Sequence, residues 1–280
     1  MEIMKDTVNQ FCSICGKNSQ FLCEADVSLR EARCPYCGAS QRNSDLAKII
    51  MRTFSTIENI SLLQAEPFLK NMEIYEAQSS GQVHDALCRL PHYTCSEFFN
   101  DIPSGQKNLN GILCQDLQNL TFPSDNFDLI ITQDIFEHIR EPEKAFVEIR
   151  RVLKPGGYHI FTIPYNEGKT TLRRITIEDG KEIQKCPPVY HGDPLRDQGA
   201  LVFTDFGSDL ITRIEKLGFS LVTIPCGIWY SPSEIPYIID ETSYETYLKY
   251  YHTNELCRFF KYNSWVFRSQ KPETQVKNNA

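Results

Sequence analysis

The sequence predicts an α/β protein built on a parallel sheet, with a small N-terminal four-cysteine zinc ribbon in front of it. Two observations predict this class. Residues 127–164 show the pattern of one βαβ unit, in which two buried strands flank an amphipathic helix. Residues 11–38 contain two Cys-x-x-Cys-Gly motifs, a spacing typical of zinc ligands. At 280 residues the chain is long enough to bury a sizeable core.

The βαβ unit can be justified piece by piece. Leu129 to Thr132 is a short apolar run, as expected of a parallel strand that is covered on both faces. Glu141-Pro142-Glu143 is typical of a helix start. The apolar residues that follow recur at helical spacing: Ala145, Phe146, Ile149, Val152 and Leu153. We expect Pro155-Gly156-Gly157 to end this helix and Tyr158 to Ile163 to form the next strand. The polar stretch Gln133 to His138 then lies just past a strand end, where ligands of open α/β sheets bind.

This region resembles a known family. The run FDLIITQDIFEHI and the following EPEKAFVEIRRVLKPGGYHIFTIP resemble the post-I to motif III region of class I S-adenosylmethionine-dependent methyltransferases, specifically the type-11 methyltransferase domain. The resemblance covers about residues 72–224, with a weaker similarity to about residue 269. It implies a Rossmann-like, doubly wound sheet that is mostly parallel, with Ser264 to Arg268 as an antiparallel last strand. It also implies S-adenosylmethionine as the methyl donor, bound across the strand ends.

The resemblance also implies a set of donor-binding residues: Glu76, Gln78, Ser79, Ser80, Gly81, Glu97, Asp116, Leu117 and Gln133. In the glycine-rich turn of the family, Glu76 matches the acidic residue and Gly81 is retained, while Gln78 and Ser80 stand where glycines are expected. Either the turn is built differently, with the Ser79 and Ser80 hydroxyls binding the donor, or donor affinity is weaker.

Two further acids follow the next strands. By resemblance, Glu97 accepts hydrogen bonds from the ribose hydroxyls, and a carboxylate can accept both. Asp116 would accept the adenine amino group, with Leu117 packed near the ring. The alternatives are a solvated acid at a strand end for Glu97 and an ordinary turn aspartate for Asp116.

The cysteine motifs indicate a metal site. In Cys12-x-x-Cys15-Gly16 and Cys34-x-x-Cys37-Gly38, the two-residue spacer lets both thiolates reach one tetrahedral ion, and the glycine permits the tight turn behind them. Four protein ligands close the coordination shell, so the predicted Zn²⁺ is structural. The alternatives are unrelated reduced thiols and a redox pair.

Three residues are candidate general bases for the methyl acceptor: Asp134, His138 and His191. Asp134-x-x-Glu137-His138 also resembles an arrangement with which some relatives bind a divalent ion, although in others it only fixes the turn. His191 lies in a predicted insert over residues 165–204, beside the strand ends. Its ordinary pKa, near ~6.5, suits proton removal at neutral pH, and a structural histidine is the alternative.

Composition and sequence patterns limit the possible organisation of the chain. The net charge of −7 disfavours a broad nucleic-acid-binding face, and no apolar run approaches the roughly 18–20 residues that span a bilayer. The N-terminus lacks the apolar core of a secretory signal, so we expect a cytosolic protein. The predicted segments are a ribbon at 1–44, a linking helical segment at 45–71, a methyltransferase domain at 72–269 with inserts at 165–204 and 225–262, and a disordered tail at 270–280. Apolar spacing predicts helices from Asp45 to Ser55 and from Phe206 to Leu217, and the Glu178-Asp179-Gly180 turn predicts a hairpin in the first insert.

The expected function is methyl transfer to an oxygen or nitrogen of a small molecule or saccharide. One alternative is a ribosomal-RNA base methyltransferase, and another is a pseudoenzyme or binding module whose altered glycine turn no longer holds the donor. The tyrosine-rich insert at 225–262 is interpreted as a substrate cap, a homodimer surface or ordinary packing.

Overall fold

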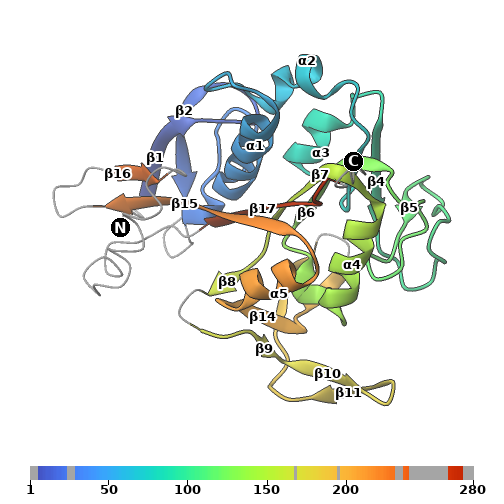
Figure 1. Cartoon of the computed structure of the whole chain (residues 1–280). Helices are drawn as coiled ribbons and strands as arrows, with labels where there is room; N and C mark the ends of the chain where they lie inside the picture. The colour runs from blue at the N-terminus through green and yellow to red at the C-terminus, as the bar shows by residue number, and fades with distance from the viewer. Residues whose placement is uncertain are drawn as a thin grey trace, which may run out of the picture. The chain divides into compact units, whose positions relative to one another are not determined.

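The computed structural model describes residues 6–23, 29–166, 169–193, 196–230, 236–239 and 264–273 (Figure 1). The chain divides into two compact units. Unit 1 comprises Met1–Met72, Ser79–Thr94 and Thr223–Arg268, and unit 2 comprises Glu73–Gln78, Cys95–Val222 and Ser269–Ala280. The domain boundaries expected from the sequence stay a prediction. Most of the tyrosine-rich insert and the tail beyond residue 273 lie outside the described residues.

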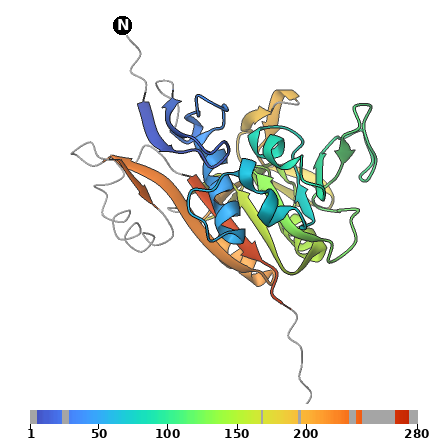
Figure 2. The same ribbon diagram turned by 90° about the horizontal axis from the view of Figure 1, so that it is seen from above.

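Unit 1 begins with an antiparallel hairpin of β1 (Asp6–Phe11) and β2 (Asn18–Cys23), and continues into helix α1 (Gln41–Phe54) (Figures 1 and 2). The Ser40 hydroxyl caps α1 by accepting a 3.3 Å hydrogen bond from the Asn43 amide. This cap explains why the helix begins ahead of Asp45, where the apolar spacing placed its start. The remaining elements of unit 1 are η1 (Leu29–Glu31), η2 (Leu62–Gln64), α2 (Glu66–Leu69), α3 (Gln82–Leu87), most of β15 (Ser220–Tyr230) and β16 (Pro236–Ile239).

Unit 2 is organised around a parallel sheet. Its strands are β3 (Ile74–Glu76), the end of β4 (Tyr93–Glu97), β5 (Leu113–Cys114), β6 (Phe127–Gln133) and β7 (Leu153–Thr162). They lie in the order β5-β4-β3-β6-β7, and the pairs β3–β6, β6–β7 and β4–β5 are parallel. Numbered along the chain, this is the order 3-2-1-4-5 of a doubly wound sheet. The predicted Rossmann-like fold is therefore confirmed.

The end of β17 (Ser264–Gln270) runs antiparallel beside β7. The Gly156 amide donates to the Lys271 carbonyl at 2.8 Å, and the Lys271 amide donates back to the Gly157 carbonyl at 3.0 Å. These reciprocal bonds join the start of β7 to the end of the final strand, so the predicted antiparallel last strand is present.

Helix α4 (Pro142–Val152) covers the sheet through an aromatic cluster. The Phe146 ring stacks on Phe136 with centroids 4.0 Å apart, and Phe161 stacks on His159 at 4.3 Å. The helix ends at Val152, earlier than predicted, because Leu153 already begins β7. Pro155 to Gly157 lie inside β7 and do not end the helix. A Cβ atom at Gly157 would lie 3.1 Å from the Phe127 carbonyl oxygen, so glycine there allows β7 to pass close to β6.

The insert after β7 is a set of short strands. They are β8 (Tyr165–Asn166), β9 (Leu172–Arg173), the hairpin of β10 (Ile175–Glu178) and β11 (Lys181–Gln184), the hairpin of β12 (Tyr190–Asp193) and β13 (Arg196–Leu201), and β14 (Thr204–Gly207). The predicted hairpin around the Asp179-Gly180 turn is confirmed. The helix predicted to begin at Phe206 begins at Leu210 and is α5 (Leu210–Lys216). It begins later because Phe206 belongs to β14, which pairs with β8 and β9.

Across the described ranges, no helix is both long and apolar enough to cross a membrane.

Candidate functional site

The polar centre of unit 2 lies where the sheet changes winding direction. β3 and β6 are neighbours, and from them the chain winds outward in opposite directions. Glu76 ends β3 and Gln133 ends β6, and the Gln133 side-chain amide donates a 2.7 Å hydrogen bond to the Glu76 carboxylate. Glu76 is fully buried and Gln133 is 8% exposed. This switch point is where open α/β sheets bind their ligands.

The next two strands bring further acids to the same edge of the sheet. Glu97 ends β4 and pairs across the strands with Cys114, and the Gln115 amide donates to the Glu97 carbonyl at 3.0 Å. Asp116 follows directly, and Leu117 is buried beside it. Unit 2 therefore places Glu76, Glu97 and Asp116 at the carboxyl ends of three neighbouring strands.

Asp116 also has a local role. Its Oδ1 accepts a 2.8 Å hydrogen bond from the Gln118 amide and a 3.1 Å bond from the Gln118 side chain, the pattern of an Asx turn. The only contact found for Oδ2 among the described residues is a longer one, 3.4 Å from the Gln118 side chain. Asp116 therefore does act as a turn aspartate, which was the alternative expected from the sequence. Its Oδ2 can still accept a hydrogen bond from another donor.

The backbone conformation of the loop after Glu76 explains why this loop lacks the glycines of the family. Within residues 77–82, Gly81 alone has a positive φ, at 94°, with ψ at 172°. That combination is almost restricted to glycine. Gln78, Ser79 and Ser80 adopt ordinary backbone angles, so this loop does not require the glycines that the family carries there. Gln78 belongs to unit 2, whereas Ser79 to Gly81 belong to unit 1.

The four predicted zinc ligands, Cys12, Cys15, Cys34 and Cys37, come together in unit 1, with all ligand atoms within 4.8 Å of one another. The Sγ atoms of Cys12 and Cys37 lie 3.7 Å apart, and those of Cys15 and Cys34 lie 3.8 Å apart. Thiolates bound at about 2.3 Å to one tetrahedral Zn²⁺ lie about 3.8 Å apart. Because the short contacts join one motif to the other, the geometry favours a four-ligand site over two separate redox pairs.

Both cysteine motifs fold in the same way. The Gly16 amide donates to the Cys12 carbonyl and the Gly38 amide to the Cys34 carbonyl, each at 2.8 Å. The two glycines have φ of 79° and 72°, as the tight turn requires. Burial raises the pKa of Cys12, and it raises the pKa of Cys37 to about 11. A cation bound here would therefore displace thiol protons.

A second group of ligand-type atoms forms in unit 2 around Glu137, which is 1% exposed. Glu137 and His138 lie in η3 (Phe136–His138), directly after the polar end of β6. Glu137 Oε1 lies 3.6 Å from His138 Nε2 and 3.5 Å from His191 Nδ1. The neighbouring Glu137 carboxylate, with smaller contributions from Asp134 and Asp205, raises the pKa of His191.

The insert is held against η3 by two hydrogen bonds. The Phe203 amide donates to the Glu137 carbonyl at 2.7 Å, and His138 Nδ1 lies 2.9 Å from the Leu201 carbonyl oxygen. Leu201 pairs with Tyr190 across the β12–β13 hairpin, which puts the next residue, His191, beside Glu137. Of the three predicted bases, His138 and His191 are brought together, and Asp134 is not part of this group. The sequence grouped Glu137 and His138 with Asp134, whereas the structure groups them with His191, whose proximity no local pattern indicated.

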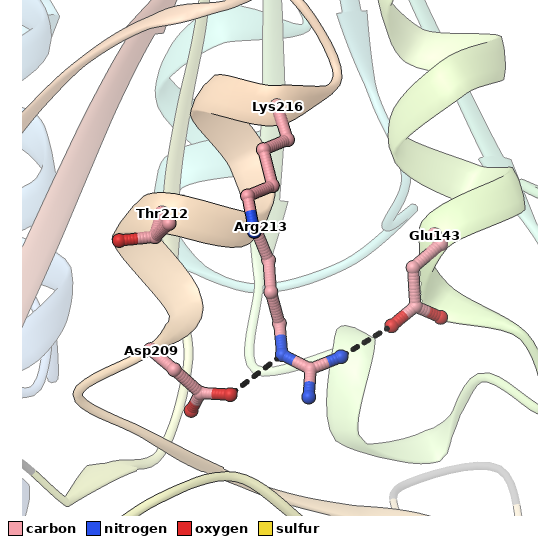
Figure 3. Close-up of a pocket in the computed structure, with 5 residues that line it drawn as sticks. All are labelled: Glu143, Asp209, Thr212, Arg213 and Lys216. Atoms are coloured by element: carbon pink, nitrogen blue, oxygen red, sulfur yellow. Dashed lines mark hydrogen bonds and ion pairs between the residues drawn. The ribbon is translucent and has the colours of Figure 1, made fainter.

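A separate hollow of about 420 Å³ lies between α4 and α5 (Figure 3). It is lined by Glu143, Asp209, Thr212, Arg213 and Lys216. Arg213 bridges the two acids, 2.7 Å from Asp209 and 3.3 Å from Glu143. Hydrogen bonds from Thr171 and Arg213 outweigh burial and lower the pKa of Asp209 to about 2. None of the predicted site residues lines this hollow, and its acids are already paired with arginine.

Residues 82–161 match the family described as a methyltransferase domain. This range runs from the start of α3 to the end of β7 and includes Glu97, Asp116, Gln133 and the Glu137-His138 pair. Residues 82–161 are thus similar to a methyltransferase domain, and they lie within a Rossmann-like α/β fold.

Matches to curated relatives are short. An uncharacterized methyltransferase of Schizosaccharomyces pombe is 43% identical over 42 residues, 15% of each chain. A ubiquinone biosynthesis O-methyltransferase of Coxiella burnetii is 32% identical over 76 residues, 27% of this chain. The chain spans 15% and 32% of the lengths of these two relatives.

Solved structures with a similar fold include a SAM-dependent methyltransferase of Methanosarcina mazei. The comparison has a TM-score of 0.43 and 13% identity, and it covers 80% of this chain and 98% of the other. Another, from Thermotoga maritima, is described as a possible histamine N-methyltransferase. It has a TM-score of 0.40, 17% identity, and coverage of 75% and 87%.

Proposed function

We propose that this protein is an S-adenosylmethionine-dependent methyltransferase that acts on an oxygen or nitrogen of a small molecule or saccharide. The observation that carries the proposal is the buried Glu76–Gln133 hydrogen bond at the switch point of the sheet, with Glu97 and Asp116 at the next two strand ends. A donor that extends across these strand ends would meet one acid after each strand.

The residues present suit the parts of the donor. Glu97 is partly exposed and is assigned to the ribose hydroxyls, and the free capacity of Asp116 Oδ2 suits the adenine amino group. Leu117 would pack near the adenine ring. The carboxypropyl part is assigned to the loop residues Glu76, Gln78, Ser79, Ser80 and Gly81, with Gln133 holding Glu76 in place. When bound, S-adenosylmethionine supplies an electrophilic methyl group on a sulfonium. The task of the protein is to align the acceptor with that group and to take its proton.

The acceptor side is assigned to the polar residues after β6 and in the insert. Asp134, His138 and His191 are the candidates for proton removal, and His191 is 40% exposed at its side chain, so an acceptor can reach it. The Coxiella relative is an O-methyltransferase, and this supports oxygen as the acceptor atom. We also propose that the cysteine cluster holds a structural Zn²⁺, since its sulfur spacing fits one tetrahedral ion.

Calorimetric titration with S-adenosylmethionine, and with its demethylated product, tests the donor site. We expect binding by the full chain and a loss of about 10- to 100-fold in affinity in both Glu97→Ala and Asp116→Ala, because each removes a charged hydrogen-bond acceptor worth about 1.5–3 kcal/mol. Asp101→Ala, an exposed acid in the same unit, is the matched control and should bind like the wild type.

Three results would contradict the proposal. Absence of binding by the wild type at high micromolar donor would favour a binding module without catalysis. Unchanged affinity in both alanine variants would show that the donor lies elsewhere. Tight, salt-sensitive RNA binding would instead favour an RNA base methyltransferase, which the net charge of −7 opposes.

A further inference from the structure

Glu137 presents a buried carboxyl group that faces two imidazole rings. Neither carboxylate oxygen has a hydrogen-bond partner among the described residues, and the residue is 1% exposed. An ionised carboxylate is costly to bury unless it is paired or coordinates a metal. The groups that face Oε1 are two imidazole nitrogens, His138 Nε2 and His191 Nδ1.

The distances are those of ligands around one ion. Hydrogen bonds between such atoms fall at about 2.7–3.2 Å, so the observed 3.5 and 3.6 Å are too long. Nitrogen and oxygen ligands bound at about 2.0–2.2 Å to one tetrahedral cation lie about 3.3–3.6 Å apart. The same geometric reasoning reproduces the sulfur spacing of the cysteine cluster. All three ligand atoms lie within 4.8 Å of one another.

The tautomer of His138 also favours a cation beside Glu137. Its Nδ1 lies 2.9 Å from the Leu201 carbonyl oxygen, which can only accept, so Nδ1 carries the proton and donates it. In the neutral ring, Nε2 then turns its lone pair toward the carboxylate of Glu137. Two lone pairs that face each other repel unless a metal cation or a second ring proton lies between them. A histidine that ligates a metal almost always donates its other ring N–H to a carbonyl or carboxylate, as His138 does here.

We propose that Glu137 Oε1, His138 Nε2 and His191 Nδ1 form a second metal site, for a divalent cation of the Zn²⁺ type, with a coordination position left open. Two imidazoles and one carboxylate suit such a cation, and three protein ligands with an open position are typical of a catalytic metal. The third ligand comes from the insert, held in place by the Leu201 and Phe203 contacts.

The role of this site rests on the proposed function, although metal binding itself does not. An acceptor hydroxyl at the open position would have its pKa lowered by the cation. Its proton would pass to Asp134, the predicted base that is not a ligand. The oxygen would then form the new bond to the methyl carbon as the bond from that carbon to the donor sulfur breaks.

Metal analysis of the full chain tests the site without donor or acceptor. After saturation with Zn²⁺ and removal of the excess, the wild type should hold two equivalents, and both Glu137→Gln and His191→Asn should hold one. Glu182→Gln, an exposed acid in the same insert that pairs with Arg140, is the matched control and should keep two. Circular dichroism checks that each variant is folded.

Co²⁺ substitution separates the two sites by spectrum. The thiolate charge-transfer bands should be unchanged in His191→Asn, while the visible bands of the nitrogen and oxygen site should be lost. A wild type that holds one equivalent, or a His191→Asn variant that keeps two, would overturn the proposal. If two equivalents bind but S-adenosylmethionine does not, the proposed function fails and the metal site stands.

Discussion

The two candidate metal sites of this chain are built in contrasting ways. The cysteine cluster takes four identical ligands from two turns of the same design, each folded by its own glycine. The cluster around Glu137 takes two adjacent residues from η3 and a third from a distant hairpin. A cation bound by four thiolates has no open coordination position and can only stabilise the fold. A cation bound by three mixed ligands keeps a position for a further ligand. The difference teaches that the first cluster is made by local sequence and the second by tertiary structure.

Breaking the cysteine cluster should have the largest effect. Cys34 is 1% exposed, and Cys34→Ser removes one of four ligands. Structural zinc contributes about 10 kcal/mol or more to folding in small zinc domains, so we expect the variant to lose Zn²⁺ from this site and the residues around it to unfold. Limited proteolysis and metal content measure this. Cys88→Ser, at an exposed cysteine, is the control. Retained zinc and unchanged protease resistance in Cys34→Ser would contradict a structural metal.

The support of the second cluster can be disturbed without touching a ligand. Gly199 precedes Ala200, the residue that pairs with His191 in the hairpin, and has a φ of 77°. A Cβ atom at Gly199 would lie 2.3 Å from the His191 carbonyl oxygen. Gly199→Ala must therefore displace the β12–β13 hairpin. We expect the variant to lose the Zn²⁺ of the second site and about 1–3 kcal/mol of stability, the range typical of overpacking.

Gly180→Ala is the matched control for this change. Gly180 has a similar φ of 74°, yet a Cβ atom there would meet nothing within 4 Å. It should cost only the left-handed backbone penalty of about 1–2 kcal/mol and keep both metal ions. Equal metal content in the two glycine variants would show that the hairpin does not position His191.

The features that could be predicted from the sequence are likewise the local ones, and those that could not depend on tertiary structure. The cysteine ligands and the β6–α4–β7 unit could be predicted because each depends on residues close in sequence. The pairing of Glu76 with Gln133 required the order of the strands. The contact of His191 with Glu137 required the position of the insert, which no local pattern encodes. The helix predicted from Phe206 was placed too early, because apolar residues at helical spacing continue back into β14.

The smallest effect concerns a buried histidine that is not a ligand. His159 is fully buried in the aromatic cluster and bonded to Thr132 at 3.0 Å, and burial lowers its pKa to about 3 from an ordinary value near 6.5. The unfolded chain binds a proton here at a higher pH than the folded chain does. The contribution of His159 to stability is therefore complete above about pH 6.5 and falls by about 1.4 kcal/mol for each pH unit below it, down to about pH 3. Urea unfolding of the wild type and of His159→Phe at pH 7, 6 and 5 measures this slope. The other ionisable groups are the same in both proteins, so the difference between the two curves isolates His159. Parallel curves would show that His159 does not remain neutral in the folded protein.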